Sequence, residues 1–286
     1  MPPTVVHLFA GSGGTALGFQ RAGFRSLGAF DFDPRACADL EQGTGEKATC
    51  VDLRTMEVAD LARAAPVCPD VVAMSAPCVG FSGCLAESLS RTDKYRDFND
   101  LALRGVQLAL EAWKQAPSGR RAPGIIVFEN VPRIRSRGKE LLKQIVDLLH
   151  AEGYAVHMED HCCAELAGGE LAQERPRFML VARHMATVPD FLRRPRVGRP
   201  LAIREVLWEL PRPRPDANGM HRLPRLSNRN KLRLACIPAG GDWRDLPAEV
   251  YLYPCDSAEL EAATGIQWRP NPGRHQGKLG VLDWDL

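Results

Sequence analysis

The residue with the clearest potential for chemistry in this sequence is Cys78, which follows a short apolar run and a proline. Residues 71–74 (VVAM) are typical of a buried parallel strand, and Pro77 ends it because proline has a fixed φ and no N–H. The thiol is therefore expected at the carboxyl end of a central strand, where open α/β sheets bind their ligands. A lone cysteine is more often a buried apolar residue, so its interpretation as a nucleophile depends on three further segments.

A carboxylate is expected at the same edge of the sheet. Residues 125–128 (IIVF) form another apolar run, and Glu129 follows it. The carboxyl ends of neighbouring parallel strands meet at one edge, so Glu129 would face the crevice that holds Cys78. Such a position is often only the start of the next turn, but glutamate is a poor cap, which favours a functional role.

Two arginines form the next segment. Arg175 and Arg177 flank a proline just before a strand expected over residues 178–182, which is predicted to be antiparallel to a strand over residues 154–162. Side chains two positions apart on a strand share a face, so both guanidinium groups are expected to point the same way.

A glycine-rich turn follows the first predicted strand, residues 4–10. Gly11, Gly13 and Gly14 lead into a helix expected over residues 15–22, and the backbone N–H groups of such a turn can approach a ligand closely. The spacing is not the dinucleotide-binding G-x-G-x-x-G, and a tight strand-to-helix connection explains the glycines equally well.

Acidic and aromatic residues follow the second predicted strand, residues 24–30. Asp31 lies about 20 positions after the glycine turn, where a carboxylate can accept hydrogen bonds from ribose hydroxyls. Phe32 offers a face to a purine ring, and Asp33 precedes a proline, as is typical of a helix start. Asp52 follows another short strand and is a candidate for contact with an adenine amino group.

Composition limits the class of protein. A chain of 286 residues can hold one large α/β domain and a smaller region. The net charge of +2 gives no general basic field, so a nucleic-acid surface would be a local patch. Nine cysteines without paired spacing predict free thiols in a reducing compartment rather than disulfides or a zinc site. No stretch is apolar and long enough to span a membrane, and the first residues do not resemble a signal peptide.

The chain is predicted to divide at residue 184. Before it, helices are expected over residues 58–65, 101–113 and 139–150, with a mobile loop over residues 88–100 and a basic loop over residues 117–124. After it, residues 185–286 are rich in proline and arginine with little periodicity. Proline-rich basic segments are often linkers, but basic residues interleaved with Trp243, Tyr251, Tyr253 and Trp268 favour a nucleic-acid-binding face.

Four blocks together resemble the DNA cytosine methyltransferases that modify carbon-5. They occur in the order of that family and read FAGSGG (9–14), PCVGFS (77–82), ENV (129–131) and QERPR (173–177). The resemblance covers about residues 5–184 and continues more loosely through IPAGG (237–241) and LP (246–247). It implies an α/β fold: a doubly wound, Rossmann-like S-adenosylmethionine-dependent methyltransferase domain (1–184) with a smaller, irregular and partial target-recognition region (185–286).

The resemblance assigns roles to the candidate residues. Cys78 would be the thiolate that adds to carbon-6 of cytosine, Glu129 would hold ring N3 and the exocyclic amine, and Arg175 and Arg177 would lie by the carbonyl oxygen and the DNA backbone. The cofactor would be S-adenosyl-L-methionine, with its methionine part near the glycines, its ribose on Asp31 and its adenine on Phe32 and Asp52; no metal is implied. The implied cofactor-binding residues are Phe9, Gly11, Gly13, Gly14, Asp31, Phe32, Asp52 and Pro77.

The sequence departs from the family pattern in three ways. His7 stands where the family usually has Asp, and Val79 where it usually has Gln. The sequence also stops at Leu286, before two further blocks of the family, so a second polypeptide that supplies them is expected as a partner.

The resemblance implies methyl transfer to carbon-5 of cytosine in double-stranded DNA, in the cytoplasm at the nucleoid, for restriction–modification or DNA protection, with no membrane partner. One alternative is an RNA cytosine-5 methyltransferase, because a family member that acts on transfer RNA shares these blocks. Another is a non-catalytic truncated fragment or one subunit of a split enzyme. The large variable region favours duplex DNA.

Overall fold

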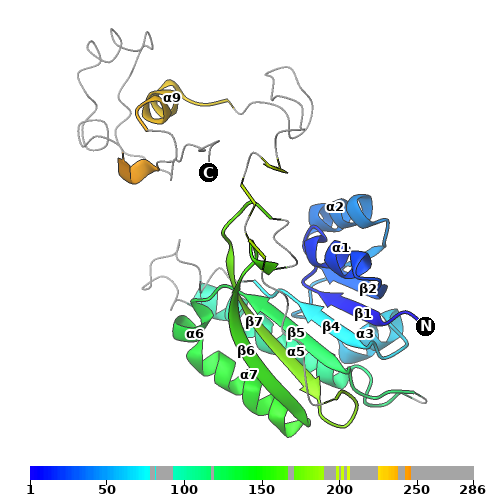
Figure 1. Cartoon of the computed structure of the whole chain (residues 1–286). Coiled ribbons are helices and arrows are strands. Elements are labelled where there is room, and N and C mark those ends of the chain that lie inside the picture. Colours follow the sequence, from blue (N-terminus) through cyan, green and yellow to red (C-terminus); the bar gives the residue numbers. More distant parts are fainter. Residues whose placement is uncertain are drawn as a thin grey trace. The chain divides into compact units, whose positions relative to one another are not determined.

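The computed structural model of the chain describes residues 1–77, 81, 93–116, 119–166, 171–189, 198–199, 201–202, 205–206, 225–237 and 242–245 (Figure 1). Cys78 and Val79 lie outside these residues. The chain divides into two compact units, the first formed by Met1–Cys163 and Arg175–Pro195 and the second by Ala164–Glu174 and Arg196–Leu286. The predicted division at residue 184 into a catalytic domain and a recognition region stays a prediction.

The first unit is built on a seven-stranded sheet. Its strands are β1 (Thr4–Leu8), β2 (Arg25–Asp31), β3 (Ala48–Cys50), β4 (Val71–Met74), β5 (Ile125–Asn130), β6 (Tyr154–Cys162) and β7 (Pro176–His184). They lie in the order β3-β2-β1-β4-β5-β7-β6, and β7 is antiparallel to both of its neighbours. Because the chain runs outward from β1 to β3 and then returns to β4, the order reverses between β1 and β4, which is where such sheets bind ligands.

Helices cover both faces of the sheet. They are α1 (Gly14–Arg21), α2 (Pro34–Thr44), α3 (Val58–Ala64), α5 (Asp93–Glu111), α6 (Ile134–Arg137) and α7 (Lys139–Ala151). Figure 1 shows α1 and α2 on one side of the sheet and α7 on the other. The doubly wound α/β fold predicted from the sequence is therefore confirmed. Among the described residues, none of the helices combines the length and the apolar composition that would let it cross a bilayer.

Alternate residues of each strand enter different cores, as the twofold side-chain period of a strand requires. Val6, Val72 and Ile126 are fully buried in the larger core, which α3, α5 and α7 complete. Val5 and Ala73, on the other face of the same strands, pack with Phe19 of α1. The buried Tyr154 at the start of β6 anchors the far edge of the larger core, because its hydroxyl donates to the carbonyl of Pro123 at 2.7 Å.

His7 is a polar residue enclosed by apolar neighbours. Its side chain is 2% exposed, its ring centroid lies 5.5 Å from that of Phe19, and neither ring nitrogen has a hydrogen-bond partner among the described residues. Burial disfavours the charged imidazolium and lowers the pKa of His7 to about 4. The ring is therefore neutral at physiological pH.

The predicted loop over residues 88–100 is wrong for its second half, because α5 begins at Asp93. Residues 93–100 contain neither glycine nor proline, and the strongly amphipathic segment that follows supplies the helix nucleus. Extending an existing helix adds one hydrogen bond per residue fixed, so a polar sequence joins it at little cost.

The excursion between β6 and β7 is closed at its base by a backbone hydrogen bond. The N–H of Cys163 donates to the carbonyl of Arg175 at 3.1 Å, and the eleven residues between them (164–174) belong to the second unit. That unit also contains α9 (Asn228–Ala235) and a short 3-10 helix, η4 (Trp243–Asp245). Arg233 of α9 is a buried charged residue of this unit, at 5% exposure.

Candidate active site

The predicted site residues gather at one edge of the sheet because the strand ends are in register. Leu8 of β1 is paired with Phe30 of β2 and Met74 of β4, and Met74 is paired with Phe128 of β5. The residues that follow these positions therefore leave the sheet at the same level. The antiparallel β7 starts at this edge, where its Phe178 is paired with Asn130.

The glycine turn after β1 is tightly constrained at Gly13. Its φ is +87°, and a Cβ there would lie 2.8 Å from Cγ of Leu40 and 3.1 Å from its Cα, so only glycine lets α2 approach this closely. Gly14 differs, because no atom lies within 4 Å of its notional Cβ. The first turn of α1 has no side-chain cap among the described residues, which leaves its N–H groups available to a ligand.

The carboxylate of Asp31, at the end of β2, accepts hydrogen bonds from backbone N–H groups. Its side chain is largely buried, at 8% exposure. Oδ2 accepts a hydrogen bond from the N–H of Gly11 at 2.8 Å, and Oδ1 accepts one from the N–H of Asp33 at 3.0 Å. Asp31 thus ties the glycine turn to the end of β2, a role that the sequence did not reveal. Each carboxylate oxygen can accept a further bond, so its predicted contact with ribose is compatible with this geometry.

The residues predicted to contact adenine lie near Asp31. Phe32 is 66% exposed, which is unusual for a large aromatic side chain and leaves its ring face free for stacking. The N–H of Val51 donates to the carbonyl of Asp31 at 2.7 Å, and this bond brings the adjacent Asp52 to the same corner. Asp52 is exposed and its Oδ1 accepts from the N–H of Arg54 at 2.9 Å. Asp33 caps α2 through the N–H of Arg35, as predicted.

The segment after β4 is held by a side chain of β5. Asn130 is 2% exposed, and its Nδ2 donates to the carbonyl of Ala76 at 3.2 Å while its Oδ1 accepts from the N–H of Val131 at 2.9 Å. Pro77, the next residue after Ala76, is half-buried. The predicted nucleophile Cys78 lies outside the described residues, and its role stays a prediction.

Glu129 and Arg177 meet across β5 and β7. The Nε atom of Arg177 lies 2.7 Å from Oε1 of Glu129, and the two side chains are 18% and 31% exposed, respectively. Arg175 is exposed, and its contact with DNA stays a prediction. Cys163 is half-buried near this pair, and burial is the main cause of the raised pKa of its thiol. The charge of Glu129 also raises this pKa, and the charges of Arg177 and Arg175 lower it. Sequence reasoning missed both Cys163 and Asn130, because their positions depend on strand register.

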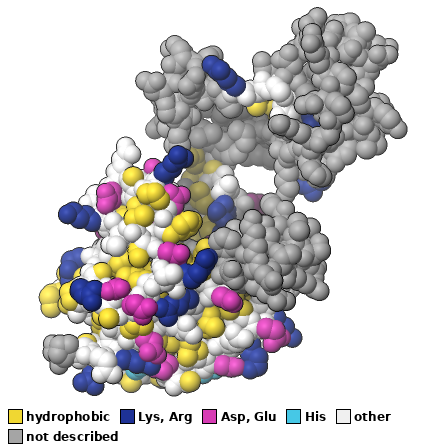
Figure 2. Space-filling model, turned by 180° about the vertical axis from the view of Figure 1, so that it is seen from behind, with side chains coloured by type: hydrophobic (Ala, Val, Ile, Leu, Met, Phe, Trp, Pro, Cys, Tyr) yellow, Lys and Arg dark blue, Asp and Glu magenta, His cyan; other side chains and the backbone are white. Residues whose placement is uncertain are grey.

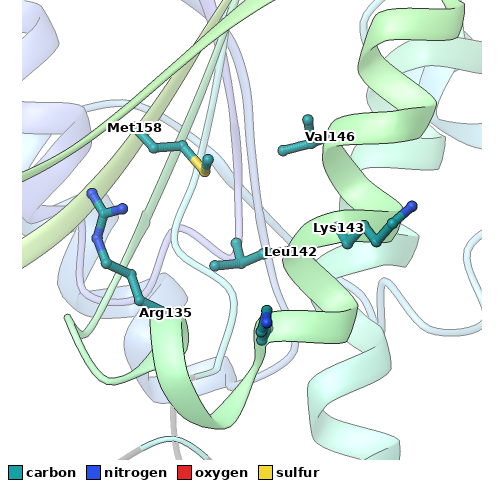
Figure 3. Close-up of a pocket in the computed structure, with 6 residues that line it drawn as sticks. Arg135, Leu142, Lys143, Val146 and Met158 are labelled. Carbon is teal, nitrogen blue, oxygen red and sulfur yellow. The ribbon is translucent and has the colours of Figure 1, made fainter.

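A separate hollow of about 270 Å³ lies between α7 and β6 (Figure 3). Leu142, Val146 and Met158 give it an apolar floor, and the cations Arg135, Lys139 and Lys143 border it. Met158 is paired with Leu180, which is buried in the larger core, so the hollow lies on the opposite face of the sheet from Glu129. None of the predicted site residues lines it, and it is not part of the candidate active site.

Basic and acidic side chains are interspersed over the first unit in the view of Figure 2. This distribution agrees with the small net charge of the chain and shows no extended basic surface on that face.

The strand order, with β7 antiparallel between β5 and β6, is that of a Rossmann-like α/β fold, which solved methyltransferase structures share. The chain belongs to the C-5 cytosine-specific DNA methylase family, because the model of that family matches residues 4–234. This family is the one that the four sequence blocks predicted.

Two relatives and one solved structure illustrate the similarity. The type II methyltransferase M.XorII of Xanthomonas oryzae pv. oryzae is 31% identical over 195 residues, which cover 66% of this chain and 42% of that protein. M.NgoFVII of Neisseria gonorrhoeae is 25% identical over 88% of this chain and 64% of its own length. The chain therefore spans less than two thirds of both relatives. A prophage-encoded protein of Escherichia coli shares the fold, with a TM-score of 0.59 at 19% identity, covering 85% of this chain and 67% of that one. The matches give no support to a second polypeptide.

Proposed function

We propose that this chain transfers a methyl group from S-adenosyl-L-methionine to carbon-5 of cytosine in double-stranded DNA. The observation that carries the proposal is the ion pair of Glu129 with Arg177, because it places a carboxylate and a guanidinium at the edge where the segment leading to Cys78 also leaves the sheet. Membership of the C-5 cytosine-specific DNA methylase family supports the reaction. The relatives are named type II methyltransferases, which supports a role in restriction–modification or DNA protection.

The residues around the glycine turn fit the proposed cofactor. Gly14 leaves open space at the start of α1, Phe32 exposes a ring face, and Asp31 and Asp52 present carboxylates at the ends of neighbouring strands. When bound, S-adenosylmethionine supplies an electrophilic methyl group on a sulfonium. We assign its methionine part to Gly11, Gly13 and Gly14, its ribose to Asp31, its adenine to Phe32 and Asp52, and further contacts to Phe9 and Pro77.

A nucleophile is needed because carbon-5 of cytosine is too electron-poor to accept a methyl group directly. The Cys78 thiolate forms a bond to carbon-6, and the electron pair of the carbon–carbon double bond moves to carbon-5. The electron pair on carbon-5 forms a bond to the methyl group while the bond from that methyl group to the sulfonium sulfur breaks, which leaves S-adenosylhomocysteine as the neutral thioether product. Carbon-5 then loses its proton to a base. The carbon–sulfur bond to Cys78 breaks last, which restores the double bond and the thiolate.

Glu129 would hold ring N3 and the exocyclic amine while charge builds on the ring. Its ion pair with Arg177 uses Oε1 only, and each carboxylate oxygen can accept a further bond, so the base can bind Glu129 while the guanidinium stays beside it. Arg177 is then available to the carbonyl oxygen of the base, with Arg175 on the DNA backbone. The base must first leave the duplex stack, which costs a few kcal/mol.

Duplex DNA is the substrate that the sequence favours, because residues 185–286 form a large basic and aromatic region beyond the catalytic blocks. DNA as substrate would place the chain in the cytoplasm at the nucleoid. The cysteines of the described part of the chain, Cys37, Cys50, Cys68, Cys162, Cys163 and Cys236, are free thiols.

Transfer of tritiated methyl groups tests the substrate. The purified chain is incubated with labelled S-adenosylmethionine and, in parallel, with unmethylated duplex DNA or a folded RNA. We expect label on cytosine carbon-5 in the DNA only. Label in the RNA alone would favour the RNA methyltransferase alternative, and no label in either would favour a non-catalytic chain.

Covalent trapping tests the nucleophile. An oligonucleotide with 5-fluorocytosine at the target position cannot lose its fluorine as a cation, so the adduct accumulates. The wild type and the control variant Cys236→Ser should both form a denaturation-resistant complex with this DNA. Cys78→Ser should not, and a covalent complex with that variant would contradict the assignment.

A further inference from the structure

The side chain of Asn130 joins the two strands that lead to the proposed catalytic residues. Strands β4 and β5 are parallel neighbours, and their pairing ends with Met74 opposite Phe128. Beyond that pair, the amide of Asn130 reaches from the last residue of β5 to the carbonyl of Ala76, at 3.2 Å. A side chain thus continues the link between the strands after their backbone pairing has stopped.

The surroundings of Asn130 make this link specific. Asn130 is 2% exposed and Ala76 is 4% exposed, so water does not readily replace either partner. The orientation of the amide is fixed from both ends, because the N–H of Val131 faces Oδ1 and the carbonyl of Ala76 faces Nδ2. The buried hydrogen bond between the Asn130 amide and the Ala76 carbonyl therefore holds the end of β5 and the segment after β4 at a fixed separation.

We propose that Asn130 is a positioning residue that sets the separation between the Glu129 carboxylate and the segment Ala76–Pro77. Glu129 is the preceding residue on the same strand end, and Pro77 leads directly to Cys78 in the sequence. The proposal rests on the proposed function, because only the joint action of Cys78 and Glu129 on one cytosine ring makes that separation matter. A misplacement of about 1 Å between reacting groups can cost about 100-fold in rate.

Two variants separate positioning from general stability. Asn130→Asp keeps the size of the side chain and an acceptor for the Val131 N–H, but it places an oxygen where Nδ2 donates to Ala76. Asn130→Ser is the milder variant, since its hydroxyl is too short to bridge to Ala76 and introduces no charge. The matched control is Tyr154→Phe, which removes another buried side-chain bond to a carbonyl, that of Pro123, elsewhere on the same sheet.

The first readout does not depend on catalysis. Amide hydrogen exchange is followed by mass spectrometry on peptides that cover residues 72–81, at a temperature where each variant is folded. We expect faster exchange in these peptides for Asn130→Asp and Asn130→Ser, and no local change for Tyr154→Phe. Unchanged exchange in both Asn130 variants would overturn the proposal whether or not the chain methylates DNA.

The second readout is the rate of covalent adduct formation on 5-fluorocytosine DNA, measured at saturating S-adenosylmethionine. We expect this rate to fall about 100-fold in the Asn130 variants. Tyr154→Phe should keep the wild-type rate. A rate within about threefold of the wild type in either folded Asn130 variant would refute the positioning role. Absence of adduct in the wild type would refute the proposed function instead, and the exchange experiment would still decide the local role of Asn130.

Discussion

Among single glycine-to-alanine substitutions in the glycine turn (Gly11, Gly13 and Gly14), Gly13→Ala should lower the stability of the first unit most. Gly13 combines two restraints, a φ of +87° and a notional Cβ at 2.8 Å from Cγ of Leu40 and 3.1 Å from its Cα and Cβ. The Leu40 side chain is fully buried, and its Cα belongs to the backbone of α2, so neither can move freely. The added methyl group must therefore strain the turn, shift α2, or both.

The magnitude follows from these two restraints. A non-glycine residue in the left-handed region costs about 1–2 kcal/mol. Overpacking by a methyl group in a close-packed core costs about 1–3 kcal/mol. The free energy of unfolding should therefore fall by about 2–5 kcal/mol, a large part of the roughly 5–15 kcal/mol that a domain usually has.

Urea unfolding followed by circular dichroism measures the change, with Gly18→Ala as the matched control. Gly18 lies in α1, the helix that Gly13 precedes; it is exposed and has no atom within 4 Å of its notional Cβ. Alanine there should raise the free energy of unfolding by up to about 1 kcal/mol, because alanine is the better helix former. Gly14→Ala should leave stability unchanged but weaken cofactor binding, if the proposed contact is right. Equal stability of Gly13→Ala and the wild type would refute this account of the turn.

Three further predictions follow from buried or paired groups. Because burial lowers the pKa of His7 to about 4, below its unfolded value of 6.5, the unfolded chain binds more protons between these pH values. Stability should thus be complete above pH 6.5 and fall by up to about 3 kcal/mol as pH drops towards 4, and His7→Leu should lose that part of the slope in urea titrations at each pH. Asp31→Asn should lower both stability, by about 1–3 kcal/mol, and cofactor affinity, whereas Phe32→Ala should lower only the affinity in calorimetry; an unchanged stability in Asp31→Asn would contradict the bracing role. Arg177→Ala should change the free energy of unfolding by no more than about 1 kcal/mol, because its pair with Glu129 is partly exposed, yet it should abolish most methyl transfer in a single-turnover assay.

The features that the sequence predicted best are those encoded by local patterns. Short apolar runs located β4 and β5, and the glycines after β1 located the start of α1. Asp33 before a proline predicted the helix cap that the structure contains. In each of these cases the physical cause lies within a few residues of the feature, so composition and spacing are enough.

The features that the sequence could not predict depend on strand register. Asp31 meets the N–H of Gly11 only because β2 lies beside β1, and Glu129 meets Arg177 only because β7 runs antiparallel to β5. The residue pattern within one strand does not specify which residue of a distant strand will lie beside it. The same holds for Asn130, whose block was recognised in the sequence but whose bond to Ala76 appears only when the ends of β4 and β5 are side by side.

The hydrogen bond between Cys163 and Arg175 has a consequence for how this chain can diverge in evolution. It brings both ends of the eleven-residue excursion together beside the nine residue pairs of β6 and β7, and none of those pairs involves a residue of the excursion. The entropic cost of a longer loop grows only with the logarithm of its length, by about 0.6 kcal/mol for each doubling. Insertions and deletions can therefore accumulate between residues 164 and 172, before the block at 173–177, while Arg177 keeps its place beside Glu129. Length variation at this position would leave the ion pair of Glu129 with Arg177 unchanged.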